Sequence, residues 1–214
     1  MGIGKQIKYA ELNGISIVFE KEPVLKGKWQ SDFFNNNHPI ILELACGKGD
    51  YSLGMAKLFP DKNFIGVDIK GNRVWSAARI AKLEQLQNIA FVRDQIDKID
   101  NYFIPGDIEE IWITFADPFP RNSDHKRRLT SRKFLNVYKK FLKKEALIHL
   151  KTDSDILYNY TKEVLADFPA KILKDYKDVY TMDKNEELYG IQTYYEKMHL
   201  KAGRTIKYLC FTLL

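Results

Sequence analysis

The sequence is poor in cysteine, which limits the kinds of site it can build. Its 214 residues contain two cysteines, Cys46 and Cys210, far apart in the chain. Two such residues predict neither a disulfide framework nor a zinc site. The four histidines show no spacing typical of metal ligands. We therefore assign no metal and expect both thiols to be free in a reducing cytoplasm.

Long apolar runs are also missing. No stretch approaches the length of a membrane span, and the segment from Met1 to Glu11 lacks the apolar core of a signal peptide. We expect a cytoplasmic protein with no membrane partner. The 34 basic and 28 acidic residues give a net charge of +6 and a pI near 9.1. This modest excess favours a polyanionic partner such as a nucleic acid, without requiring one.

The chain length and the 45% hydrophobic content suit a single α/β core. Residues 1–38 mix short apolar pieces with lysines and end in an asparagine-rich turn at 35–37. We interpret them as an N-terminal arm on a domain that spans residues 39–214.

Short apolar runs separated by polar or helix-period stretches then recur along the chain: 40–44, 64–67, 89–92 and 111–115. A fifth run, 146–150, follows a predicted helix at 132–142, which Ser131 is well placed to cap. A loop-rich stretch around 182–190 precedes a last strand-like run at 206–213. This alternation predicts a doubly wound, mostly parallel sheet, whose ligands bind beyond the carboxyl ends of the strands.

The first predicted strand ends in residues 43–50 (ELACGKGD), followed by a predicted helix. Gly47 and Gly49 would let the backbone approach a ligand, and Glu43 could accept a hydrogen bond from it. A plain tight turn remains the alternative. Asp68 ends the second strand, where a carboxylate can bind ribose hydroxyls. Asp94 ends the third strand and is either part of an adenine pocket or a solvated acid.

Two features argue against a dinucleotide in this place. The fingerprint G-x-G-x-x-G, framed on Gly47 and Gly49, meets Ser52 where its third glycine should stand. Asp50 lies near the helix N-terminus, where its charge would repel a pyrophosphate. S-adenosylmethionine carries a sulfonium cation and no phosphate, so an acid-rich pocket suits this cofactor better.

The fourth strand runs into residues 113–120 (ITFADPFP), which place Asp117 and the ring of Phe119 beside the cofactor. A base could stack on Phe119; alternatively, this is a proline-rich turn with Phe119 buried. Residues 121–128 (RNSDHKRR) follow at once. Cations at this position would hold the phosphates of a nucleic acid, unless the stretch is only a solvated loop.

Four motifs together carry a family resemblance: 115–120 (FADPFP), 125–129 (HKRRL), 151–153 (KTD) and 193–196 (TYYE). From residue 40 to its C-terminus, the chain resembles the bacterial tRNA (guanine-N7)-methyltransferase family. The resemblance implies the class I methyltransferase fold with a seven-stranded sheet. It also implies methyl transfer from S-adenosylmethionine to N7 of the variable-loop guanine of tRNA, conventional position 46.

The resemblance also implies roles for individual residues. Asp117 would be catalytic. The implied cofactor contacts are Glu43, Asp68, Asp94 and Asp117, beside the glycine turn of Gly47 and Gly49. The implied substrate contacts are Arg121, Asp153, Thr193, Tyr194, Tyr195 and Glu196.

Guanine N7 has a lone pair and no proton, so this reaction would need alignment more than a base. Asp117 would then position the substrate and stabilise charge, while Asp153 or Glu196 could accept the N1 and N2 hydrogens of guanine. An amino-group methyltransferase is the alternative enzyme, because residues 117–119 partly match the Asp-Pro-Pro-aromatic loop of enzymes that methylate exocyclic nitrogens. A non-catalytic RNA-binding module is the alternative outside enzymes.

The chain departs from the family pattern at four positions of these motifs. Ala45 stands for the first glycine of the cofactor turn, and Phe119 stands where tryptophan is common. Ala116 replaces a common proline, and Arg121 replaces a frequent lysine. We expect a more restricted turn and weaker stacking, but no polar group needed for chemistry is lost.

Overall fold

The computed structural model describes residues 11–12, 14–21, 23–181 and 190–214. The first ten residues of the predicted arm and residues 182–189 of the predicted loop lie outside the described residues. Among the described residues, no helix is both long and apolar enough to cross a membrane.

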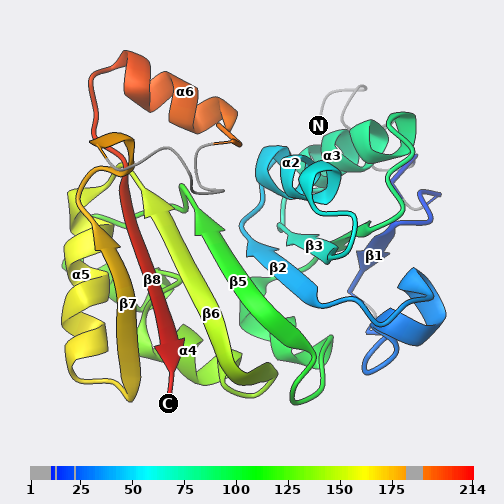
Figure 1. Ribbon diagram of the computed structural model, residues 1–214, viewed down its shortest axis with the longest axis horizontal. Coiled ribbons are helices and arrows are strands. Elements are labelled where there is room, and N and C mark those ends of the chain that lie inside the picture. The colour runs from blue at the N-terminus through cyan, green and yellow to red at the C-terminus, as the bar shows by residue number, and fades with distance from the viewer. Residues whose placement is uncertain (1–10, 13, 22, 182–189) are drawn as a thin grey trace.

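An eight-stranded sheet runs through the molecule in the order β1-β4-β3-β2-β5-β6-β8-β7 (Figure 1). The strands are β1 (Val18–Glu20), β2 (Ile40–Leu44), β3 (Asn63–Val67), β4 (Ile89–Arg93), β5 (Ile108–Thr114), β6 (Leu142–Thr152), β7 (Ala170–Tyr176) and β8 (Lys207–Leu213). Among the described strands, β8 alone runs antiparallel to the other seven. The doubly wound, mostly parallel sheet is confirmed. It has one strand more than predicted, since β1 of the predicted arm pairs with β4.

Within the described residues, five helices pack around the sheet: α2 (Asp50–Leu58), α3 (Gly71–Leu83), α4 (Arg132–Tyr138), α5 (Asp155–Ala166) and α6 (Tyr194–Lys201). Short helical turns lie at Trp29–Phe34, Ile96–Asn101, Asn122–Arg127 and Val179–Thr181. Helix α4 ends four residues earlier than predicted, because β6 already begins at Leu142. Ser131 occupies the N-cap position of α4, but its hydroxyl donates to the carbonyl of Lys126 at 3.1 Å instead of capping the helix.

Two hydrophobic cores lie on opposite faces of the sheet. Helices α2 and α3 cover one face, and α4 and α5 cover the other (Figure 1). All five residues of β2 and of β3 are buried, as expected for strands covered on both faces. Trp29 is also buried, in the core on the face that α4 and α5 cover. Its indole N–H donates to the carbonyl of Tyr102 at 2.9 Å. Part of the predicted arm is therefore packed into the domain.

The strand order reverses between β2 and β5. From β2 the chain proceeds outward through β3 to β4, and it then returns to β5 on the other side of β2. The carboxyl ends of β2 and β5 therefore lead into connections that diverge, which leaves a crevice between them. Helix α6 lies above this edge of the sheet (Figure 1).

Candidate active site

A cavity of about 790 Å³ lies at the carboxyl ends of β2 to β5. Five of the predicted cofactor residues border it: Glu43, Gly47, Asp68, Asp94 and Asp117. Three of the predicted substrate residues also border it: Thr193, Tyr194 and Tyr195. Segments far apart in the sequence thus meet at one site.

The glycine turn between β2 and α2 adopts left-handed backbone angles. Gly47 has φ +59°, and its N–H donates to Asp68 Oδ2 at 3.0 Å. Gly49 has φ +73° and does not border the cavity; a Cβ there would lie 2.8 Å from the Cβ of Ala77 on α3. Ala45 also has φ +58°, a region that glycine tolerates far better than alanine. This explains why a glycine is expected at position 45.

Asp68 is a buried carboxylate at the end of β3. Its Oδ2 accepts the Gly47 N–H, and its Oδ1 accepts the Lys70 N–H at 2.7 Å. The guanidinium of Arg73 lies 4.0 Å away. Each carboxylate oxygen can accept more than one hydrogen bond. Asp68 is therefore fixed in position and still able to accept a ligand hydroxyl.

Glu43 is 5% exposed and connects β2 to both α2 and β5. Its Oε2 accepts the Ser52 N–H at 3.0 Å and the Ser52 hydroxyl, while Oε1 accepts the Thr114 hydroxyl at 2.7 Å. Burial raises the pKa of Glu43 to about 7, although these hydrogen bonds act in the opposite direction. The charge of this group therefore changes near neutral pH.

Asp94 and Asp117 also border the cavity. Asp94 accepts the Tyr102 hydroxyl at 2.9 Å and the Gln95 N–H at 2.7 Å. Asp117 is exposed and accepts the Phe119 N–H at 3.0 Å. The loop that carries Asp117 begins and ends in left-handed residues, with φ +50° at Phe115 and +43° at Phe119.

Phe119 is half-buried at the cavity wall, not enclosed in a core as the alternative interpretation expects. The guanidinium of Arg127 lies 4.3 Å from the centre of its ring and also pairs with Asp124 at 3.5 Å. A base that stacks on this ring face would therefore have to displace Arg127.

The first turn of α6 is joined to the cofactor end of the sheet. The Tyr194 N–H donates to Asp50 Oδ2 at 2.9 Å, and Lys48 lies 5.8 Å from the Tyr194 ring centre. Arg73, which faces Asp68, also donates to the Tyr195 hydroxyl at 3.4 Å. Predicted cofactor and substrate segments are thus in direct contact.

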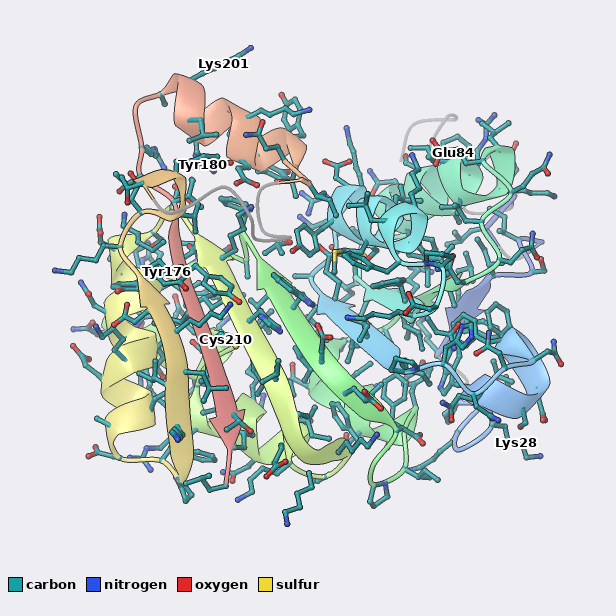
Figure 2. The ribbon with its side chains drawn as sticks, viewed as in Figure 1. Lys28, Glu84, Tyr176, Tyr180, Lys201 and Cys210 are labelled. Atoms are coloured by element: carbon teal, nitrogen blue, oxygen red, sulfur yellow. The ribbon has the colours of Figure 1, made fainter. Side chains whose placement is uncertain are left out.

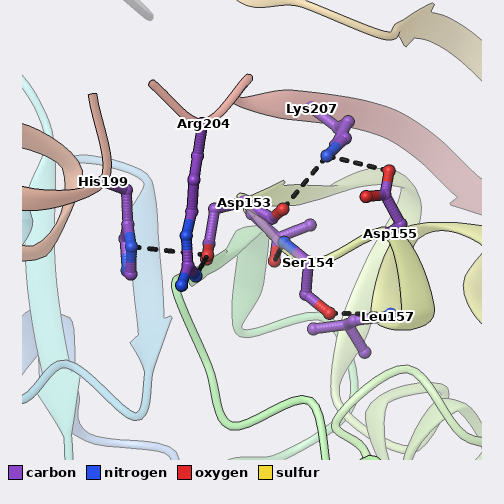
Figure 3. Close-up of polar contacts among 8 residues, drawn as sticks. Asp153, Ser154, Asp155, Leu157, His199, Arg204 and Lys207 are labelled. Carbon is purple, nitrogen blue, oxygen red and sulfur yellow. Dashed lines mark hydrogen bonds and ion pairs between the residues drawn. The ribbon is translucent and has the colours of Figure 1, made fainter. Parts of the chain in front are cut away.

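Arg121, Asp153 and Glu196 do not border the cavity. Asp153 pairs with Arg204 at 2.6 Å and His199 at 3.4 Å (Figure 3). Glu196 is fully buried and pairs with Lys151 at 2.7 Å. Substrate contact by these three residues stays a prediction.

Further contacts hold α6 and β8 against neighbouring segments. The hydroxyl of Tyr180, which lies directly below α6 (Figure 2), donates to Glu196 at 2.6 Å. Beside Asp153, Lys207 of β8 binds the Asp153 carbonyl at 3.0 Å and Asp155 at 2.8 Å (Figure 3). The Tyr180 contact therefore ties α6 to the turn at Val179–Thr181, and the Lys207 contacts tie β8 to the residues after β6.

Sequence reasoning missed several residues of the wall. Ile69, 53% exposed, offers an apolar side chain directly after Asp68. Five cations also border the cavity: Lys48, Lys70, Arg73, Arg127 and Lys133. Apart from Arg127, these cations lie outside the basic stretch at 121–128. In the sequence, the one feature that could have indicated them is their position after a predicted strand or in the first turn of a predicted helix. In the described part of the chain, no group of three or more His, Cys, Asp or Glu residues could hold a metal ion.

Comparison with known proteins gives consistent matches. The model of a family described as "Putative methyltransferase" matches residues 37–209. The tRNA (guanine-N(7)-)-methyltransferase of Bacteroides thetaiotaomicron is 42% identical over all of this chain and 87% of its own length. The protein of the same name from Porphyromonas gingivalis is 47% identical, over 88% of this chain and 77% of its own.

Solved structures resemble the fold. A 30S ribosomal A1408 methyltransferase from an uncultured bacterium superposes with a TM-score of 0.63 at 16% identity, covering 92% of this chain and 98% of its own. At this identity, the likeness describes the architecture of the chain and not its substrate.

Proposed function

The chain belongs to the tRNA (guanine-N7)-methyltransferase family, and from this premise we propose that it transfers a methyl group from S-adenosylmethionine to N7 of a guanine in tRNA. The observation that carries the proposal is a single cavity in which acids suited to the cofactor meet the segment suited to the substrate. We further propose that the target is the variable-loop guanine at position 46 and that the reaction takes place in the cytoplasm, without a metal or a membrane.

The residues that border the cavity fit S-adenosylmethionine. Asp68 is held by two backbone N–H groups and can accept ribose hydroxyls, while Ile69 offers an apolar surface for the adenine. Asp94 borders the same cavity. The methionine moiety of the cofactor would lie beside Glu43 and Gly47 of the glycine turn. The cavity volume lies within the usual range of ligand sites, about 300–1,000 Å³.

The charge pattern also fits this cofactor better than a dinucleotide. Asp50 accepts the Tyr194 N–H beside the N-terminus of α2, so an acid occupies the place where a pyrophosphate would bind. The carboxylates of the cavity favour a cation instead. When bound, S-adenosylmethionine supplies an electrophilic methyl group on a positively charged sulfur.

The reaction requires alignment more than proton transfer. The lone pair of guanine N7 forms the new bond to the methyl carbon as the sulfur–carbon bond breaks and its electron pair stays on sulfur. The purine ring gains a positive charge, which the Asp117 carboxylate stabilises. The Phe119 N–H, at 3.0 Å, orients that carboxylate without neutralising it. No side chain has to remove a proton before the attack.

The acceptor binds at the outer part of the cavity. Thr193, Tyr194 and Tyr195 form its rim together with cations that suit tRNA phosphates. Arg127 would move from the Phe119 ring to a phosphate when the base enters. The exposed Arg121, which begins the turn at Asn122–Arg127, would bind a phosphate further out.

The decisive experiment identifies the product. The protein is incubated with bulk tRNA and labelled S-adenosylmethionine, and the tRNA is digested to nucleosides. The expected labelled product is 7-methylguanosine from the variable loop, and the Asp117→Asn variant, as matched control, should give the same nucleoside more slowly. A label on an exocyclic amino group would support the amino-group methyltransferase, and tRNA binding without label would support the RNA-binding module.

A further inference from the structure

The three cations that end the basic stretch do not share one environment. Lys126 and Arg127 are exposed, whereas Arg128 is 4% exposed. The sequence alone suggests that these three consecutive residues form one phosphate-binding surface. In the structure, two of them face solvent and one faces the interior.

Arg128 binds the loop that carries Asp117. Its Nε donates to the Pro118 carbonyl at 2.9 Å, and its Nη2 donates to the Phe119 carbonyl at 3.0 Å. The guanidinium lies 4.3 Å from the ring centre of Tyr160 on α5. The Tyr160 hydroxyl in turn donates to the His125 carbonyl at 3.3 Å. The planar fork of Arg128 is thus fixed between two carbonyls and an aromatic ring.

These two carbonyls belong to the part of the loop that orients Asp117. Phe119 has φ +43°, a conformation that only surrounding contacts can maintain in a non-glycine residue. The N–H of Phe119 donates to Asp117 Oδ1, and its carbonyl accepts from Arg128. Both peptide groups that flank this strained residue are therefore held, one of them by the proposed catalytic carboxylate.

We propose that Arg128 is a positioning residue, which holds the 117–119 loop so that Asp117 faces the reacting base, and that it does not bind RNA. To reach a phosphate, its buried guanidinium would have to leave both carbonyls and the Tyr160 ring. The phosphate contacts of the stretch then belong to Lys126 and Arg127. The proposal rests on the proposed function for its kinetic consequence, but the contacts themselves do not depend on it.

The test compares Arg128→Lys with Lys126→Ala. Lysine keeps the charge but cannot reproduce two parallel hydrogen bonds and a stacked plane. For Arg128→Lys, we expect kcat to fall by about tenfold or more, with the KM for tRNA and the salt dependence of tRNA binding unchanged. For Lys126→Ala, we expect weaker tRNA binding and a salt slope reduced by about one. A flattened slope with unchanged kcat in Arg128→Lys would overturn the proposal.

A second measurement separates this proposal from the proposed function. Amide hydrogen exchange in peptides that cover residues 115–122 should accelerate in Arg128→Lys and stay as in the unmodified protein in Lys126→Ala. Tyr160→Leu, which removes the ring but neither hydrogen bond, should accelerate the same peptides less. Each variant is also titrated with S-adenosylmethionine in a calorimeter, and a variant that binds the cofactor normally is taken as folded. Unchanged hydrogen exchange in both Arg128→Lys and Tyr160→Leu would refute the positioning role of Arg128. An unmodified protein that methylates no tRNA would refute the proposed function alone.

Discussion

Three residues of the cavity wall adopt backbone angles that L-amino acids disfavour. Ala45, Phe115 and Phe119 have φ between +43° and +58° and all border the cavity. Each such residue costs about 1–2 kcal/mol, so the surrounding contacts must compensate. Three such residues at one cavity agree with a site in which loop geometry serves binding more than stability.

Ala45 offers a direct test of this strain. We expect Ala45→Gly to leave the free energy of unfolding unchanged or to raise it by up to about 1 kcal/mol, because relief of strain offsets the greater freedom of glycine in the unfolded chain. Urea denaturation measures the effect. The control is Ala78→Gly in α3, where the buried alanine lies in regular helix and the loss should be at least about 1 kcal/mol. Equal losses at both positions would contradict the interpretation.

The raised pKa of Glu43 predicts that the free energy of unfolding depends on pH. Its pKa is about 7 in the folded protein, against 4.5 for an unperturbed glutamate, so the folded state binds more protons between these values. Its contribution is complete below pH 4.5 and is lost as the pH rises through 7, a change of about 3 kcal/mol. Glu43→Gln removes this titration. Relative to the unmodified protein, the variant should gain about that amount of unfolding free energy between pH 4 and 8; a constant difference would show that Glu43 does not titrate there.

Asp68 tests the cofactor assignment. We expect Asp68→Ala to weaken S-adenosylmethionine binding by about 1–3 kcal/mol, since it removes acceptors for the ribose hydroxyls and for the Gly47 N–H. Titration calorimetry gives the affinity, and circular dichroism checks the fold. Asp61→Ala, at an exposed acid before β3, serves as the control and should bind normally. Unchanged affinity in a folded Asp68→Ala protein would refute the assignment.

At the scale of elements, the apolar runs locate the strands of the central sheet well. The runs at 40–44 and 64–67 coincide with β2 and β3 to within one residue. The sequence does not predict β1, because a three-residue edge strand has no periodicity to detect. It also cannot show that β8 inserts antiparallel between β6 and β7, because that order depends on contacts between distant segments.

The candidate site shows the same limit. Acids at strand ends are predictable, since parallel strands bring their carboxyl ends to one edge. The side-chain directions within the motifs at 125–129 and 193–196 are not. Arg128 and Glu196 are polar and therefore expected at the surface, yet both are buried by partners far along the chain.

The buried ion pair between Glu196 and Lys151 predicts that substitution of Glu196 lowers the free energy of unfolding. Glu196→Gln removes the carboxylate that pairs with the buried Lys151 ammonium, and burial already lowers the pKa of Lys151. We expect a loss of about 3–5 kcal/mol of unfolding free energy, measured by urea denaturation. The matched control is Glu84→Gln, which breaks the exposed pair with Lys57 and should cost at most about 1 kcal/mol. If Glu196 acted only on the guanine, its variant would lose activity at unchanged stability.

Across the whole molecule, charges of both signs gather around one opening. Carboxylates lie at the strand ends within the cavity, and five cations stand in its wall, contributed by α3, α4 and the loops. The net charge of +6 adds a weak long-range attraction for RNA. Cations that can hold phosphates, together with acids that can face a sulfonium, suit the proposed reaction between a polyanion and a cationic methyl donor.

The methylated atom can be identified with a modified substrate. A tRNA with 7-deazaguanine at the target position carries a C–H group where guanine has the N7 lone pair. It should still bind, because phosphates supply most of the affinity, and its binding should weaken with salt as for normal tRNA. It should accept no methyl group, since the nucleophile is absent while every exocyclic amino group remains. Filter binding and transfer of labelled methyl measure the two quantities on the same RNA, with the guanine-containing transcript as control. Methylation of the deaza substrate would place the reaction at another atom and favour the amino-group methyltransferase.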